Sequence, residues 1–301
     1  MNQPKIFFLA IIAALVCGAP VLMAQSRAPE LKFGEIKHKD KADTLGFEER
    51  PYFLLVEQCE KALAEHDYEA AGLRLVEAMG IEPDNPLNVA LLSNLGMIYY
   101  YNEQDSLALV TLDVAVSRAP RLIGAREHRA RVLIGMGRDS EAYEEYGRII
   151  DIDSVNCDAR FTRGMMALYR GELQVAQADF ATLSRVAPLW RNTILATATM
   201  YSMTGNDREA VSLYRRLLDK DKLPEYYSAL AGCLITLDNL DEASKVIGEG
   251  LERFSSDPEL YYYRAMLNHK RYLDVEAHQD AKKAIEFGAN PDRVRKIFVK
   301  E

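Results

Sequence analysis

Residues 95–99 read Leu-Gly-Met-Ile-Tyr, and alanines follow at positions 108 and 115 before a proline at position 120. A small residue recurs from Gly96 onward at intervals of 34, 34, 34, 33 and 34: Ala130, Gly164, Ala198, Ala231 and Ala265. A second series starts from Ala108 and keeps the same intervals: Ala142, Ala176, Ala210, Ala243 and Ala277. A period of this length indicates a solenoid of repeated units.

Each unit predicts two antiparallel helices joined by a short turn. A small residue on each helix lets the pair approach closely, and aromatic side chains fill the space beside them: Tyr146, Phe180 and Tyr214. Glycines mark the turn, where a helix that ends in a left-handed residue favours glycine: Gly137, Gly171 and Gly205. Prolines end several units, since proline cannot continue a helix: Pro83, Pro120 and Pro188.

This pattern resembles the tetratricopeptide repeat family, whose small residue at repeat position 8 matches Gly96 and whose alanine at position 20 matches Ala108. The resemblance implies an all-α, right-handed superhelical solenoid of about seven helix-turn-helix repeats with a C-terminal capping helix. The repeats are expected at 52–85, 89–122, 123–156, 157–190, 191–224, 224–257 and 258–291, with the cap at 292–301. Cys59 at position 8 of the first repeat departs from the family pattern.

The first 51 residues precede the repeats. Residues 1–24 are typical of a signal peptide, because Lys5 precedes an apolar run at 6–16 that is too short to span a bilayer. An uncleaved anchor is the alternative. We therefore expect export to the periplasm or the cell envelope. Residues 25–51 are polar and predict a flexible linker, although Leu31, Phe33 and Ile36 leave open a strap that docks on the solenoid.

Composition and motifs argue against several classes of function. The net charge is −8 without a dense basic tract, which disfavours nucleic acid as a ligand. The histidines share no metal-ligand spacing, and neither a phosphate loop nor a nucleophile elbow is present. Cys59 and Cys233 fall at helix positions that favour core packing. We therefore expect no enzyme activity, no cofactor and no metal site.

Acidic and basic residues are correlated between the two helices of three repeats. Wherever position 7 is arginine, position 23 is acidic: Arg129 with Glu145, Arg163 with Asp179, and Arg264 with Asp280. In the other four repeats position 7 is not basic and position 23 is not acidic. This correlation predicts a structural ion pair inside each of the three repeats rather than three ligand-binding arginines.

The family resemblance also implies a concave groove lined by the first helix of each repeat. Its inward positions give the expected peptide-binding residues: Asn94, Met97, Tyr100, Tyr101, His128, Arg131, Phe161, Met165, Tyr169, Asn192, Thr199, Tyr262 and His269. Aromatic, methionine and arginine side chains are enriched at protein interfaces. Glu127 and His128 stand where the family's carboxylate clamp needs basic residues, so we expect no preference for a free peptide C-terminus.

The sequence therefore predicts a non-catalytic scaffold of the bacterial cell envelope that binds another protein or a peptide segment in this groove. One alternative is a structural subunit that assembles through its outer face or its ends. Another is an accessory protein that binds a glycan or a small molecule through its tyrosines. The identity of the partner and the oligomeric state stay open at this point.

Overall fold

The computed structural model describes residues 50–299. The expected signal peptide at 1–24 and nearly all of the expected linker at 25–51 lie outside the described residues. Residues 50–299 form helices and short turns without a strand, as predicted. They divide into two compact units, residues 50–163 and residues 164–299. None of the described helices is long and apolar enough to cross a membrane.

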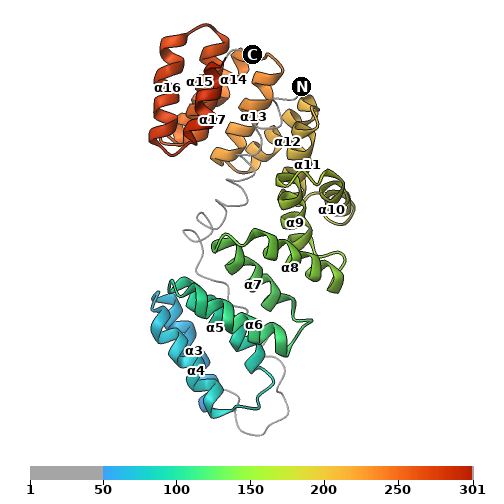
Figure 1. Ribbon diagram of the computed structural model, residues 1–301, viewed down its shortest axis with the longest axis vertical. Helices are drawn as coiled ribbons and strands as arrows, with labels where there is room; N and C mark the ends of the chain where they lie inside the picture. The colour runs from blue at the N-terminus through green and yellow to red at the C-terminus, as the bar shows by residue number, and fades with distance from the viewer. Residues whose placement is uncertain (1–49, 300–301) are drawn as a thin grey trace. The chain divides into compact units, whose positions relative to one another are not determined.

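The unit 50–163 consists of antiparallel helix pairs. They are α3 (Pro51–Ala64) with α4 (Tyr68–Ile81), α5 (Asn88–Tyr101) with α6 (Asp105–Arg118), and α7 (Ile123–Gly135) with α8 (Asp139–Ile152). Figure 1 shows α3 beside α4 and α5 beside α6. Helix α5 also packs on α4 and on α7, so each pair contacts its neighbour in the sequence. Helix α9 (Cys157–Tyr169) begins in this unit and ends in the next.

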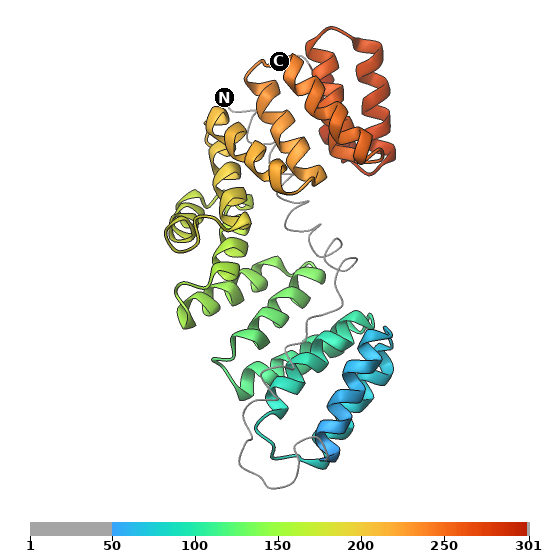
Figure 2. The same ribbon diagram turned by 180° about the vertical axis from the view of Figure 1, so that it is seen from behind.

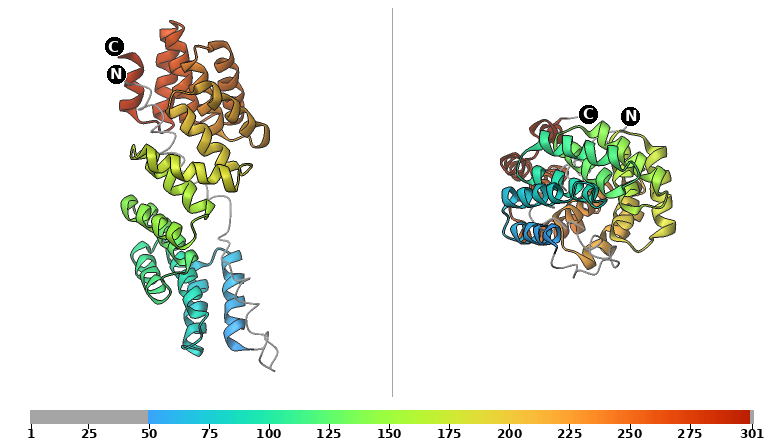
Figure 3. Two further views of the ribbon diagram at one scale, coloured as in Figure 1. Left: turned by 90° about the vertical axis from the view of Figure 1, so that its right-hand side faces the viewer. Right: turned by 90° about the horizontal axis from the view of Figure 1, so that it is seen from below.

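The unit 164–299 continues the same pattern. Its helices are α10 (Leu173–Val186), α11 (Arg191–Met203) with α12 (Asp207–Lys220), α13 (Pro224–Thr236) with α14 (Leu240–Arg253), and α15 (Pro258–Lys270) with α16 (Asp274–Glu286). A short helix α17 (Pro291–Arg295) and a 3-10 turn η3 (Lys296–Phe298) follow. The pairing of α15 with α16, coloured red, is visible from behind in Figure 2 and from the side in Figure 3.

The small residues lie where the two helices of a pair cross, as the two series predict. A methyl group added to Gly96 of α5 would stand 2.5 Å from Cγ of Leu112 on α6. Gly164 faces Phe180 of α10 in the same manner. Ala176 and Ala210 have no exposed surface. Since a larger side chain would hold the helices apart, the small residues set the close packing of each pair.

The turn inside each pair contains one residue with positive φ at repeat position 15. The predicted glycines occupy it with φ of 71°, 76° and 81°: Gly137, Gly171 and Gly205. The other four described repeats use non-glycine residues with φ of 58° to 61°: His66, Glu103, Asp238 and Tyr272. The turn geometry is therefore constant, and four repeats form it with residues that adopt this conformation at a cost.

Tyr272→Gly should stabilise the protein by about 0.5–1 kcal/mol. Removing the left-handed strain gains about 1–2 kcal/mol, and the greater freedom of glycine in the unfolded chain offsets about 0.5–1 kcal/mol of it. The Tyr272 side chain is 90% exposed, so its loss removes little packing. Urea denaturation measures the change. Leu273→Gly is the control, because φ at Leu273 is −94°, and it should not stabilise. A lower midpoint for Tyr272→Gly would contradict the strain argument.

Candidate partner-binding surface

Five of the expected groove residues are buried, and for them the prediction of partner contact is wrong. Their exposed fractions are 5% or less: Asn94, Met97, Met165, Thr199 and Tyr262. They belong to the packed interior of the helix pairs. The family positions from which they were transferred therefore do not all face solvent in this chain.

The contacts of these residues explain their burial. Helix α5 is enclosed by α4, α6 and α7, which leaves Asn94 and Met97 without a solvent-facing side. The Thr199 hydroxyl donates to the Leu195 carbonyl at 2.9 Å and lies 3.2 Å from the Tyr214 hydroxyl on α12. Tyr262 is covered by the guanidinium of Arg293, whose carbon is 3.8 Å from the ring centre.

Four other expected residues form one surface of the unit 50–163, which we call the tyrosine–arginine face. It consists of Tyr100 and Tyr101 at the end of α5 with His128 and Arg131 on α7. The Tyr100 hydroxyl lies against the α7 backbone at Gly135, where a Cβ atom would overlap it. Arg131 precedes Gly135 by four residues and therefore lies on the same side of α7. The surface thus spans the first helices of two neighbouring repeats.

Contacts beneath the face hold its rings in place. The Tyr101 ring stacks on Tyr68 of α4 with 5.7 Å between centres, and it is tilted against Tyr100 at 5.9 Å. His128 Nδ1 lies 2.9 Å from the Ser93 hydroxyl on α5. Arg131 is exposed, whereas the other three side chains of the face are only partly exposed: Tyr100, Tyr101 and His128. The face is therefore an ordered aromatic surface with an accessible cation.

Burial keeps the Tyr100 hydroxyl neutral. Burial raises the pKa of Tyr100, the Asp105 carboxylate and Tyr101 add to the rise, and Arg131 opposes it. Burial likewise raises the pKa of Tyr146 on α8 to about 12, again with Arg131 opposing. A neutral hydroxyl can both donate and accept a hydrogen bond. The face can therefore pack apolar groups, hydrogen-bond a backbone and attract a carboxylate.

The remaining expected groove residues lie elsewhere. Phe161 is partly exposed on α9. Tyr169, Asn192 and His269 belong to the unit 164–299, where Tyr169 is 50% exposed and Asn192 is partly exposed. His269 lies 3.3 Å from Asp274, and its ring centre is 5.4 Å from that of Phe298. The tyrosine–arginine face is therefore defined without these four residues.

Sequence reasoning missed two residues that build the face. Tyr68 lies on the second helix of its repeat, outside every inward family position, yet its ring supports Tyr101. Gly135 follows no small-residue series, and its role becomes visible only when Tyr100 is placed against it. Neither residue had a periodic signal that could have identified it.

The charged pairs form a larger network than predicted. Glu145 is 1% exposed and accepts from Arg126 at 2.7 Å, from Arg129 at 3.1 Å and also from Arg148. Arg129 also donates to Asp113 on α6 at 2.7 Å. The predicted pair of Arg129 and Glu145 is therefore present inside its repeat, and Arg129 also joins that repeat to the preceding one.

Of the other two predicted pairs, one is present and one stays a prediction. Arg264 binds Asp280 through two bonds of 2.6 Å and 2.9 Å. Arg163 and Asp179 lie in different compact units, so their pairing stays a prediction.

The thiols of the described residues are not activated. Burial raises the pKa of Cys59 and of Cys233 to about 12, and it also raises the pKa of Cys157. A thiol acts as a nucleophile or a metal ligand through its thiolate, which a raised pKa suppresses. Within residues 50–299, no group of three histidine, cysteine or acidic side chains could hold a metal ion.

One buried carboxyl is held by hydroxyl and thiol groups. The Ser202 hydroxyl donates to Asp207 at 3.2 Å and lies 3.3 Å from the Cys233 sulfur. In this second contact either the hydroxyl or the thiol can be the donor. Burial raises the pKa of Asp207, and the hydrogen bonds from Ser202 and Cys233 oppose the rise.

Asp207→Asn should therefore become more stable relative to the unchanged protein as the pH rises. As the pH rises, Asp207 of the unfolded chain loses its proton near the ordinary pKa of 3.8. In the folded protein the same carboxyl loses its proton only at higher pH. The free energy of unfolding falls across that interval, and the asparagine variant lacks this loss. Urea denaturation at about pH 3 and about pH 7 measures the difference. A difference that stays constant with pH would contradict the raised pKa.

The fold of the chain is shared with several solved structures. A tetratricopeptide repeat protein from Parabacteroides merdae is 25% identical, with a TM-score of 0.67 over 82% of this chain and 97% of that one. PilW, a type IV pilus biogenesis factor, is 15% identical, with a TM-score of 0.57 over 69% of this chain and 96% of that one. PilF of Pseudomonas aeruginosa is 14% identical, with a TM-score of 0.60 over 71% of this chain and 97% of that one.

No protein-family model matches the chain. The repeats are nevertheless recognisable in the two small-residue series and in the helix crossings that these residues form. The similarity in fold to the Parabacteroides structure extends over nearly all of that protein. On these grounds the chain has the fold of tetratricopeptide repeat proteins.

Proposed function

We propose that the protein is a non-catalytic scaffold that binds an extended segment of another protein on the tyrosine–arginine face. The observation that carries this proposal is the joining of Tyr100, Tyr101, His128 and Arg131 into one ordered surface across α5 and α7. Aromatic and arginine side chains dominate the energetics of protein interfaces. Rings that are fixed before binding lose little conformational entropy when a partner arrives.

The chemistry of the face indicates the kind of segment that it binds. Partly exposed tyrosine rings favour apolar or aromatic side chains, and their hydroxyls can bond to an extended backbone. Arg131 favours an acidic side chain beside them. The partner segment is therefore of mixed apolar and acidic composition, and binding does not require its free C-terminus.

The location follows from the first 24 residues, which lie outside the described part of the chain. Lys5 and the apolar run at 6–16 have the order of a signal peptide. We place the scaffold in the periplasm or at the cell envelope. Its partner is then another exported or envelope protein.

The test combines capture of partners with two matched variants. Tyr101→Ala with Arg131→Ala removes a ring and the cation from the face. Tyr272→Ala with Arg295→Ala removes the same two side-chain types from exposed sites in the other unit. After crosslinking in an envelope extract, the bound proteins are identified and the affinity for the captured segment is measured. We expect the first variant to bind about thirtyfold more weakly, since an interface hot spot contributes 2 kcal/mol or more.

The control variant should bind like the unchanged protein. Both variants must retain the melting temperature of the unchanged protein, so that a lost interaction reports on the face rather than on folding. Unchanged binding by the Tyr101 and Arg131 variant would exclude the tyrosine–arginine face as the binding site.

An exposed apolar stripe on α6 favours a second candidate, a structural subunit that assembles with copies of itself. Leu107, Val110 and Val114 recur at the spacing of one helix face and are 45%, 59% and 38% exposed. Light scattering on the unchanged protein and on Val110→Lys distinguishes the two candidates. A stable oligomer that Val110→Lys dissociates would support assembly.

A further inference from the structure

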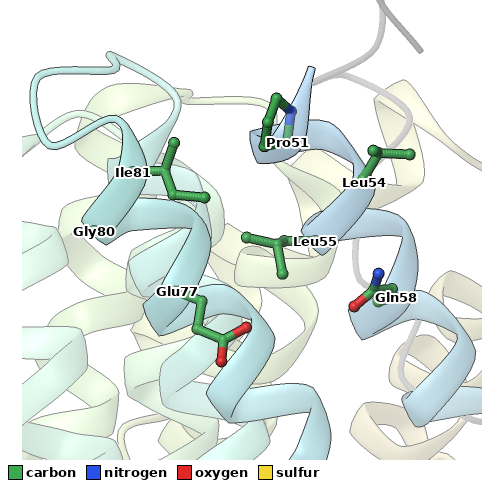
Figure 4. A pocket seen from close by; sticks show the side chains of 7 residues that line it. All are labelled: Pro51, Leu54, Leu55, Gln58, Glu77, Gly80 and Ile81. Carbon is green, nitrogen blue, oxygen red and sulfur yellow. The ribbon is translucent and has the colours of Figure 1, made fainter. Parts of the chain in front are cut away.

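The first helix pair carries an open apolar groove between α3 and α4. Its volume is about 490 Å³, and Leu54, Leu55, Gly80 and Ile81 are among its lining residues. Figure 4 shows the Leu55 and Ile81 side chains directed toward the space between the two helices. Leu54 is 42% exposed and Ile81 is 52% exposed. Gly80 leaves open space at one side of the groove.

Comparison between repeats shows that this groove is unusual. Leu54 stands at repeat position 3, and the other described repeats bury their position 3 to 3% exposure or less: Leu91, Ala125, Ala159, Thr193, Tyr226 and Leu260. In the second repeat, Leu91 packs in one core with Tyr52 and Leu75 of the first pair. The preceding pair therefore covers this position there. Within residues 50–299 no pair precedes α3 and α4, so Leu54 stays exposed.

The chain covers its opposite end with its own residues. Helix α17 follows the last pair, and its Val294 is 1% exposed. Solenoids require such caps because a terminal repeat otherwise exposes the apolar face that an inner repeat would bury. The first pair has the apolar face but no cap within the described residues.

The chain just before α3 has the composition that a cap requires. Residues 31–47 contain five large apolar side chains: Leu31, Phe33, Ile36, Leu45 and Phe47. This segment joins α3 through Arg50, at the end of the groove that Pro51 lines. The fifteen residue-to-residue steps from Ile36 to Pro51 can span up to about 50 Å, while the α3 part of the groove is only about 10 Å long.

We propose that residues 31–47 fold back and dock their apolar side chains in the α3–α4 groove as an N-terminal cap. The covalent link gives the segment an effective concentration in the millimolar range, which favours it over a second copy or a free partner. Gly80 makes room in the groove for a ring such as that of Phe33. The segment then acts as a strap on the first repeat rather than as a free linker.

Site-specific photo-crosslinking in the full chain tests this proposal. A benzophenone side chain at position 54 should react with residues 31–47 of the same chain, and the yield should not change on dilution. The control position is 110, an exposed apolar site on α6, which should give no crosslink to residues 31–47. Peptide mapping by mass spectrometry identifies the linked residues.

Variants in the segment make the test specific. Phe33→Ser with Ile36→Ser should lower the crosslinking yield at position 54 about tenfold or more, because burying such side chains supplies the docking free energy. Lys32→Ser with Lys37→Ser should leave the yield unchanged. A crosslink from position 54 to a second chain or to another part of the same chain would overturn the proposal. So would the absence of any protein crosslink while the benzophenone is consumed.

Discussion

Replacing Glu145 with alanine should cost about 3–5 kcal/mol of the free energy of unfolding, because it leaves buried arginine charge without its partner. Glu145 is 1% exposed, and Arg126 and Arg129 are only 11% and 17% exposed at their side chains. Both guanidinium groups donate to the same carboxylate. The variant would leave these positive charges close to one another in a poorly hydrated site.

Urea denaturation followed by circular dichroism measures this loss. The matched control is Glu144→Ala on the same helix, since Glu144 is 64% exposed and pairs with the half-exposed Arg148. Such a surface pair contributes about 0–1 kcal/mol. Equal effects of the two substitutions would show that the Glu145 site is hydrated and that the three arginines do not depend on it.

Removing the side chain of Arg293 should release the C-terminal cap and cost about 3 kcal/mol, in the range of a broken buried ion pair. The guanidinium lies over the Tyr262 ring and donates to Glu259 at 2.6 Å. Arg293→Ala therefore leaves the Glu259 carboxylate in a site where it is only 17% exposed. It also uncovers the tyrosine ring that the cation now shields.

Hydrogen exchange resolves this effect along the chain. Arg293→Ala should speed exchange in α15 and α16, and exchange in α5 and α6 should not change, because each repeat contacts only its neighbours. Arg295→Ala is the control, since Arg295 is 74% exposed and pairs with the exposed Asp292. If both substitutions leave α15 and α16 equally protected, Arg293 does not hold the cap.

The helix pairs were predictable because their signal is periodic and local. Gly96 and the residues spaced from it recur in fixed phase, and the reason is that every pair has the same crossing. The left-handed turn position was predictable only where glycine fills it. Tyr272 adopts the same φ, but tyrosine has no preference for that conformation from which it could be predicted.

The candidate site was less predictable because burial depends on what packs against a helix from outside it. Met97 and Arg131 share repeat position 9, yet Met97 is 1% exposed and Arg131 is exposed. An apolar side chain at that position is enclosed by the neighbouring helices, whereas a long charged one extends its end into water. The position alone therefore does not decide whether a residue can contact a partner.

The pairing of each helix with its neighbours in the sequence has a consequence for how the protein is made. Tyr52 of the first pair donates to Asn88 of the second, a link of only 36 residues. Contacts of such short range form early and quickly, because little loop-closure entropy opposes them. A repeat can therefore fold once the next one has emerged from the ribosome. The N-terminal pairs need not wait for the C-terminus, which shortens the time for which apolar helix faces are exposed to aggregation.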